Sequence, residues 1–186
     1  IEVLRRQEMS RDLELVRERN RELGLISKYD ELTGLLNLRG FTEQIKNFCS
    51  KSEHQRAYII CADLDHLKEI NDTWGHPAGN FALRSVANIF NGCLRSQDVV
   101  ARTGGDEFLI LLNCHERNFQ DIFRKRVRDA CAAFNAESGK PFLVEVSLGI
   151  TEFKPSPETD IPAIIEHADK DLYEAKKFRR NSIRRP

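Results

Sequence analysis

The sequence lacks a long apolar run, a net charge and a visible signal peptide. No stretch approaches the roughly 20 apolar residues of a transmembrane helix, so we expect no membrane span in this segment. The 29 Lys and Arg residues equal the 29 Asp and Glu residues in number. A general nucleic-acid-binding protein usually carries a strongly basic face, and the composition gives no sign of one. We therefore expect no nucleic-acid partner, although local basic clusters can still bind phosphate.

Cysteine is sparse, and its arrangement argues against two classes of fold. The five cysteines are an odd number and no two form a CxxC pair, which disfavours a structural zinc site and a disulfide scaffold. Most have apolar neighbours and are interpreted as small core residues, which fits a reducing, cytoplasmic compartment. The chain begins at Ile1 rather than Met, so we interpret it as a segment of a longer protein. The parent protein can then carry a sensor or a membrane anchor.

The first 28 residues are polar and favour a helix. Their apolar residues follow a 4-3-4-3 spacing, which is typical of the seam of a coiled coil that pairs two chains. The alternative is a solvated helix that only adjoins the next domain. We predict a signalling helix over residues 1–28 and a globular domain over residues 29–186. The seam positions are Met9, Leu13, Val16, Asn20 and Leu23.

Hydrophobic periodicity predicts a mixture of helices and strands in the globular part. Apolar residues at helical spacing predict helices over residues 38–49, 80–95, 119–134 and 161–175. Short apolar or alternating runs predict strands over residues 57–62, 98–102, 108–112 and 144–150. Two glycines separate the second and third of these strands, which therefore form a hairpin. The mixture predicts an α+β fold with a central sheet.

Two pairs of acidic residues stand where strands end. Asp63 and Asp65 follow a buried strand, and carboxylates at a sheet edge suit Mg²⁺, which takes oxygen ligands together with substrate phosphates. Asp106 and Glu107 follow the glycine pair, whose positive φ lets a ligand approach the backbone. The alternatives are a turn or helix cap for the first pair and a plain hairpin with a solvated acidic edge for the second. If strand and hairpin are neighbours in one sheet, the four carboxylates form one metal-holding site.

Residues 102–108 read RTGGDEF and resemble the signature of the GGDEF family of diguanylate cyclases. Five further motifs occur in the family's order between residues 30 and 182. They are DELTGL at 30–35, DLDHLK at 63–68, NDTWGH at 71–76, SLGI at 147–150 and ADKDLYEAK at 168–176. Chance does not supply six ordered motifs, so the sequence is identified as a member of this family.

The resemblance implies a fold related to class III nucleotidyl cyclases and polymerase palms, with a five-stranded, mostly antiparallel sheet flanked by helices. It implies that residues 29–186 form a catalytic domain that binds one GTP. Two such domains meet as a homodimer, form cyclic di-GMP and release pyrophosphate. Mg²⁺, or Mn²⁺ in its place, is the implied cofactor.

The resemblance also implies a role for individual residues. Asp63, Asp106 and the Leu64 carbonyl hold the metal, Glu107 completes the acidic site, and Asp106 helps to deprotonate the ribose hydroxyl. The implied phosphate contacts are Lys68, Lys176, Arg180 and the backbone of His66 and Leu67, with the backbone of Gly104 and Gly105 open to the substrate. The implied guanine contacts are Asn71, His76 and Asn80. Spacing alone favours a basic, solvated helix end for Lys176 and Arg180, and the family resemblance reverses that preference.

One departure from the family bears on specificity. The family usually has Asp where this chain has Asn80, and a carboxylate accepts hydrogen bonds from both N1–H and N2–H of guanine. The amide of Asn80 accepts through one oxygen only. We therefore expect weaker guanine binding and weaker rejection of adenine.

A second motif bears on regulation. Arg95 and Asp98 precede the glycine pair at the spacing of the family's RxxD product-inhibition site. The alternative is an Arg at a helix end and an Asp in a turn. Three functions stay open: an active diguanylate cyclase under feedback, a cyclase that also makes mixed guanine–adenine dinucleotides, and a non-catalytic receptor for GTP or cyclic di-GMP.

Overall fold

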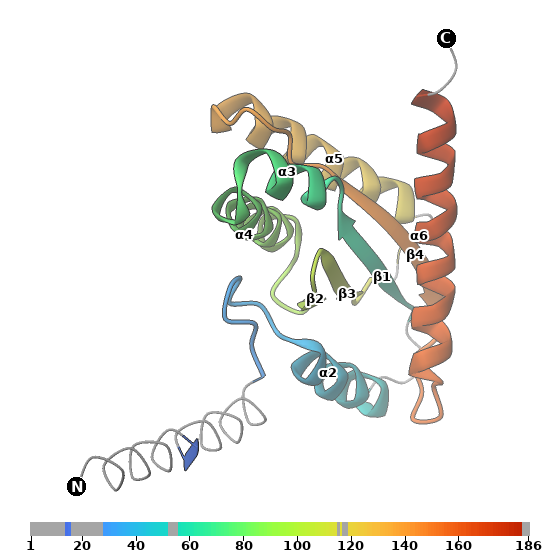
Figure 1. The fold of residues 1–186 in the computed structure, drawn as a ribbon. Helices are drawn as coiled ribbons and strands as arrows, with labels where there is room; N and C mark the ends of the chain where they lie inside the picture. The colour runs from blue at the N-terminus through green and yellow to red at the C-terminus, as the bar shows by residue number, and fades with distance from the viewer. Residues whose placement is uncertain (1–13, 16–27, 52–55, 115, 117–118, 184–186) are drawn as a thin grey trace, which may run out of the picture.

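The computed structural model describes residues 14–15, 28–51, 56–114, 116 and 119–183 (Figure 1). The predicted coiled-coil seam lies outside these residues. The helices are α2 (Leu38–Lys51), α3 (Leu67–Trp74), α4 (His76–Cys93), α5 (Phe119–Ser138) and α6 (Ile161–Ile183). The strands are β1 (Ala57–Leu64), β2 (Val99–Gly104), β3 (Glu107–Leu112) and β4 (Val146–Phe153). Within the described ranges, no helix combines the length and apolar character needed to cross a membrane.

The strands form one sheet in the order β2-β3-β1-β4, and every neighbouring pair is antiparallel. The α+β class is confirmed, but the expectation of five strands is wrong for the described residues, where the sheet has four. The place beside β2 holds only a single bridge, between Leu36 and Ala101. The chain cannot extend this bridge into a strand because α2 begins two residues later, where the Asn37 side chain accepts a hydrogen bond from the Gly40 amide.

Helices cover both faces of the sheet (Figure 1). The central strand β1 is buried along its whole length, and its side chains alternate between two cores. Tyr58, Ile60 and Ala62 join the core with residues of α4 and α5. Ile59 and Cys61 join the core with residues of α2 and α6. All five cysteines are buried and free of disulfides, in agreement with their interpretation as core residues.

The segment between β1 and α4 departs from the sequence prediction. Helix α3 was not predicted, because it is short and only Ile70 of its eight residues is buried. Helix α4 begins at His76 rather than near residue 80, with Pro77 in its first turn. Gly75 separates the two helices with φ of 82°, a conformation that favours glycine.

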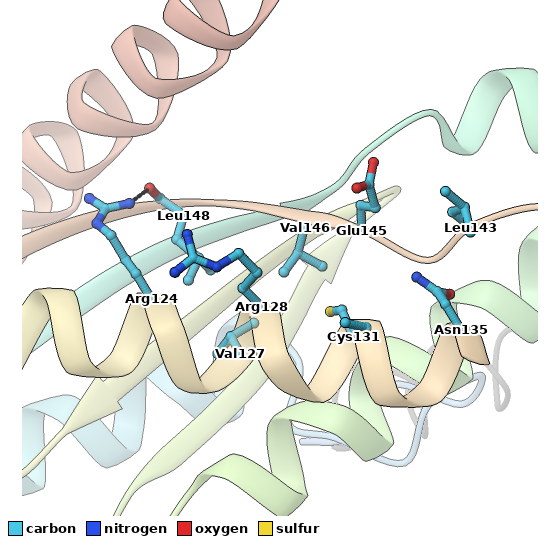
Figure 2. Close-up of a pocket in the computed structure, with 10 residues that line it drawn as sticks. Arg124, Val127, Arg128, Cys131, Asn135, Leu143, Glu145, Val146 and Leu148 are labelled. Carbon is cyan, nitrogen blue, oxygen red and sulfur yellow. Dashed lines mark hydrogen bonds between the residues drawn. The ribbon is translucent and has the colours of Figure 1, made fainter. Parts of the chain in front are cut away.

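The edge strand β4 begins at Val146, two residues later than predicted. Val144 is buried, but the Asn135 side chain of α5 bonds both its amide and its carbonyl, at 2.8 and 2.9 Å, and so replaces strand pairing. Further along the same edge, Arg124 of α5 donates a hydrogen bond to the Leu148 carbonyl (Figure 2).

Helix α6 packs on β4 at a glycine. A Cβ at Gly149 would lie 2.0 Å from the Ala168 carbonyl oxygen and 2.3 Å from the Leu172 amide nitrogen. Only glycine therefore allows α6 to come this close to the sheet, and this approach brings the C-terminal half of the helix over the end of β1.

Candidate functional site

The sheet brings the two acidic motifs together. Asp63 of β1 lies opposite Glu107 of β3, and the Leu64 amide donates to the Asp106 carbonyl at 3.0 Å. A cleft of about 370 Å³ opens at this end of the sheet. Seven predicted site residues line it, namely Asp63, Leu64, His66, Leu67, Lys68, Asp106 and Lys176. The condition stated for a single acidic site, that strand and hairpin be neighbours, is met.

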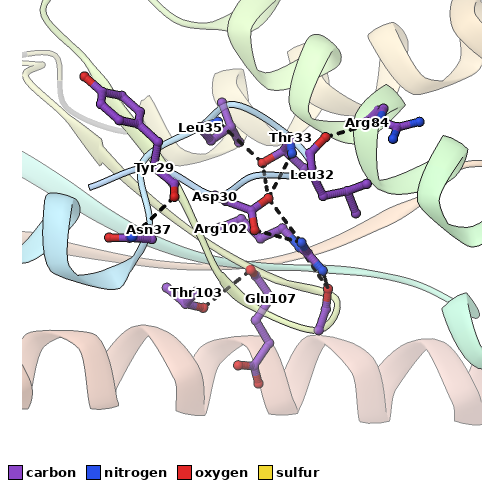
Figure 3. Close-up of polar contacts among 11 residues, drawn as sticks. Tyr29, Asp30, Leu32, Thr33, Leu35, Asn37, Arg84, Arg102, Thr103 and Glu107 are labelled. Atoms are coloured by element: carbon purple, nitrogen blue, oxygen red, sulfur yellow. Dashed lines mark hydrogen bonds and ion pairs between the residues drawn. The ribbon is translucent and has the colours of Figure 1, made fainter. Parts of the chain in front are cut away.

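The glycine pair gives the hairpin an open turn. Gly104 has φ of 150° and Gly105 φ of 51°, and no atom lies within 4 Å of the place where either Cβ would stand. The turn backbone is therefore accessible to a ligand beside the cleft. Arg102 stabilises the turn, because two of its guanidinium nitrogens donate hydrogen bonds to the Gly105 carbonyl oxygen, at 2.7 and 3.0 Å. Its third nitrogen bonds both carboxylate oxygens of Asp30, at 3.0 and 3.1 Å (Figure 3).

Asp63 is the buried charge of the site, with 8% of its surface exposed. The Lys176 ammonium of α6 lies 2.7 Å from its Oδ1. Burial raises the pKa of Asp63, and the Asp106 and Asp65 carboxylates act in the same direction, whereas the hydrogen bond from Lys176 opposes them. The ionised form of this carboxylate is therefore stabilised by positive charge in the cleft.

The donor set fits a hard divalent cation that also binds substrate. Within the described ranges, no group of three or more His, Cys, Asp or Glu side chains lies close enough to hold a metal on protein ligands alone. Mg²⁺, however, is usually bound by one or two carboxylates together with substrate phosphates. The cleft offers the carboxylates of Asp63 and Asp106, and Lys176 already compensates the charge of the first.

The turn after β1 is bonded to two residues that the sequence analysis did not assign, Glu145 and Ser147. Asp65 accepts a hydrogen bond from the Ser147 hydroxyl at 2.7 Å, and its amide donates to the Glu145 carbonyl at 2.9 Å. All three residues line the cleft. His66 follows in the left-handed region, with φ of 61°, which is uncommon for a residue other than glycine. The SLGI motif was a signal for Ser147, since antiparallel pairing puts Ser147 opposite Asp63.

The predicted base contacts lie on α3 and α4, outside the residues that line the cleft. A Cβ at Gly79 would lie 2.0 Å from the Asn71 side-chain oxygen, so Asn71 packs directly against this glycine of α4. Asn80 is the next residue and is exposed, as is His76 at the start of the same helix. At the α3–α4 contact, Asn71 therefore lies against the residue that precedes Asn80.

Two further predicted residues contribute no described side chain to the cleft. Glu107 is exposed and shares a sheet face with Asp63, but it does not line the cleft. Arg180 lies in α6, one turn beyond Lys176, and its side chain is outside the described part of the molecule.

Arg95 and Asp98 form a separate turn at the start of β2. The Asp98 carboxylate accepts hydrogen bonds from the backbone amides of Arg95, at 2.8 Å, and of Asn113, at 3.1 Å. Arg126 of α5 lies at the same small pocket and donates to the Cys93 carbonyl at 3.0 Å. The sequence analysis missed Arg126 because it is 28 positions after Asp98 and belongs to another element. No residue of this pocket lines the cleft.

The chain is similar to known proteins in sequence and in fold. A family model described as diguanylate cyclase, GGDEF domain, matches residues 27–182. The chain belongs to the GGDEF family. This GGDEF domain is 36% identical to Diguanylate cyclase A of Treponema denticola over 126 residues, which cover 67% of this chain and 34% of that protein. The chain thus spans about a third of the length of this relative.

Two solved structures place the fold in the same family. The first is diguanylate cyclase SiaD of Pseudomonas aeruginosa in complex with its activator SiaC, with 30% identity and a TM-score of 0.72. The match covers 95% of this chain and 70% of SiaD. The second is the GGDEF domain of DgcB from Caulobacter crescentus in complex with c-di-GMP, with 26% identity and a TM-score of 0.68. This match covers 81% of this chain and 91% of that one.

Proposed function

We propose that this GGDEF domain condenses two molecules of GTP into cyclic di-GMP and two pyrophosphates. The 3′-hydroxyl oxygen of each GTP forms a bond to the α-phosphorus of the other. The bond from that phosphorus to the bridging oxygen of the β-phosphate breaks, and pyrophosphate leaves. Each hydroxyl loses its proton to a base in the site. The observation that carries the proposal is the convergence of Asp63, Asp106 and Lys176 on one cleft beside an open glycine turn.

The residues of the cleft fit the parts of this reaction. Lys176 lies beside a buried carboxylate and is partly exposed, so its ammonium is available to a triphosphate. Lys68 adds a second positive charge at the cleft. We propose Arg180 of α6 as a further phosphate contact. The open backbone at Gly104 and Gly105 admits close approach of phosphate oxygens.

A divalent cation completes the charge balance. Asp63, Asp106 and the Leu64 carbonyl are its proposed ligands, with Glu107 adjoining, and Mg²⁺ is preferred because all of these donors are oxygens. When bound, it neutralises phosphate charge and acidifies the attacking hydroxyl. Asp106 accepts the hydroxyl proton, since it is the partly exposed carboxylate next to the turn.

The reaction needs two domains, because each GTP is both nucleophile and electrophile. We infer a homodimer in which the two clefts face each other. Specific activity should therefore rise with protein concentration, and should rise at lower concentration when residues 1–28 are present than when they are deleted. Equal specific activity at every dilution would exclude this assembly.

Feedback by the product is proposed at Arg95 and Asp98. A guanidinium suits bidentate contact with guanine or phosphate, and Arg126 adds a second one at the same pocket. The product complex of the DgcB GGDEF domain supports binding of cyclic di-GMP by this fold. The pocket at Arg95 and Asp98 shares no lining residue with the cleft, which suits a regulatory site rather than a catalytic one.

A second candidate is a cyclase with relaxed base choice. Asn80 follows Gly79, against which Asn71 packs, and both Asn71 and Asn80 carry side-chain amides. An amide offers one acceptor where guanine presents two donors, so selection against adenine is weakened. Under this reading, incubation with GTP and ATP together yields a mixed dinucleotide as well as cyclic di-GMP.

The experiment is chromatography of products after incubation with Mg²⁺ and GTP, then with GTP plus ATP. Cyclic di-GMP from the wild type, and none from Asp63→Asn or Asp106→Asn of unchanged circular dichroism, supports the proposal. Wild-type turnover in either variant would show that the metal assignment is wrong. Binding of GTP and cyclic di-GMP with no turnover would identify a receptor instead.

A further inference from the structure

Two side chains from different helices meet at the outer edge of β4. Arg124 of α5 donates one guanidinium hydrogen bond to the Leu148 carbonyl (Figure 2). It donates another to Oδ2 of Asp171, on α6, at 2.6 Å. The same oxygen of Asp171 accepts from the Ile150 amide at 2.8 Å. We call Arg124 and Asp171 the edge clamp. It bonds an outward-facing carbonyl and an outward-facing amide of the edge strand, as a neighbouring strand would.

The edge clamp and the cleft act on opposite sides of one helix. Asp171 and Lys176 are five residues apart, so they project about 140° apart around α6. Leu172 lies between these two directions and packs on Gly149, where α6 meets the sheet. The helix is therefore held under its axis by Leu172, on its outer flank by Asp171, and on its inner flank by the contact of Lys176 with Asp63.

We propose that Arg124 and Asp171 are positioning residues that set the rotation of α6 and thereby hold Lys176 over the cleft. Rotation of α6 about the Leu172 contact would move Lys176 away from Asp63, and the edge clamp opposes that rotation. The inference rests on the proposed function, in which Lys176 contacts the triphosphate.

The backbone partners distinguish the edge clamp from an ordinary surface ion pair. The side chains of Arg124 and Asp171 are 32% and 44% exposed, and exposed pairs usually contribute little by charge alone. Here the strand decides which residue must be the donor and which the acceptor. The Leu148 carbonyl needs a donor such as Arg124, and the Ile150 amide needs an acceptor such as Asp171. By contrast, the Lys170–Glu166 pair on the same helix is more exposed, and neither of its side chains bonds a strand.

The first test measures binding of a non-hydrolysable GTP analogue and of guanosine to the full chain, with Mg²⁺ present. Asp171→Ala should weaken analogue binding by about threefold to tenfold, the range expected for coupled neighbours, and should leave guanosine binding unchanged. Glu166→Ala is the matched control and should change neither affinity. Alanine favours helix at both positions, so α6 itself is retained. Faster hydrogen exchange at the Ile150 amide in Asp171→Ala alone would report the loss of the edge clamp directly.

The second test is a double-mutant cycle with Lys176→Met. If Asp171 acts through Lys176, Asp171→Ala should have no further effect on analogue binding in the Lys176→Met background. An equal loss in both backgrounds would overturn the inference and leave the proposed function standing. No binding of the analogue by the wild type would instead refute the proposed function, and this inference with it.

The third test reverses the charges. Arg124→Asp combined with Asp171→Arg keeps an ion pair but gives each strand group the wrong partner. We expect analogue binding as weak as in Asp171→Ala, with α-helical circular dichroism retained. Recovery of wild-type affinity would show that an ion pair of either polarity suffices and that the bonds to the strand do not position the helix.

Discussion

Replacing Gly149 with alanine should separate α6 from the sheet. The added Cβ would lie 2.0 Å from the Ala168 carbonyl oxygen and 2.3 Å from the Leu172 amide nitrogen, both of them backbone atoms that cannot rotate away. Helix α6 must therefore retreat by about 1 Å, and overpacking of this kind usually costs about 1–3 kcal/mol. The same retreat lengthens the 2.7 Å contact between Lys176 and Asp63. We expect lower stability together with weaker GTP binding.

Gly92→Ala in α4 is the matched control. No atom lies within 4 Å of a Cβ at this exposed helical glycine, so the substitution should stabilise the domain by about 0.5–1 kcal/mol. Thermal unfolding followed by circular dichroism should show shifts of opposite sign, at roughly 2–4 °C for each kcal/mol. A Gly149→Ala variant with wild-type Tm and wild-type affinity for a GTP analogue would refute the close packing of α6 on β4.

Three further predictions concern charge, feedback and base choice. Burial raises the pKa of Asp30, but hydrogen bonds from Thr33 and Arg102 outweigh it, so the folded-state pKa lies below the usual 3.8. The ionised Asp30 therefore stabilises the fold above pH 3.8, and this stabilisation is lost as the pH falls through the lower, folded-state pKa. Asp30→Asn should have a lower free energy of unfolding than the wild type at pH 7. In acid titrations the difference in free energy of unfolding between the two proteins should shrink. Arg95→Ala should relieve inhibition by added cyclic di-GMP without raising the KM for GTP, and inhibition as strong as in the wild type would remove the regulatory site. Asn80→Asp should tighten GTP-analogue binding relative to the ATP analogue by about 1–3 kcal/mol in calorimetry, and unchanged affinities would show that residue 80 does not read the base.

The sequence predicted the elements whose signals are local. The apolar run that ends at Asp63 and the glycine pair between two short strands both predict what the structure contains. The convergence of Asp63 and Asp106 was a conditional expectation, because strand order is not a local property. Lys176 was assigned by resemblance alone, since its position near a helix end is more typical of a solvated lysine.

The features that were missed depend on distant partners. Val144 alternates correctly for a strand but is bonded by Asn135 instead. Arg124 and Asp171 are 47 positions apart and appear in the sequence as ordinary charged residues on two helices. The fifth strand implied by the family is absent from the described residues, whose sheet has four strands. Each of these outcomes is decided by tertiary contacts that no local pattern encodes.

The most direct test of the proposed activity is the stoichiometry of the products. Phosphorus NMR of the full chain with GTP and Mg²⁺, at high protein concentration, should show two pyrophosphates for each cyclic di-GMP, because each of the two nucleotides loses its β- and γ-phosphates together. Release of inorganic phosphate with GDP would identify a hydrolase and contradict the attack of a ribose hydroxyl on the α-phosphate. No change in GTP at any protein concentration would equally contradict a catalytic role for the cleft formed by Asp63, Asp106 and Lys176.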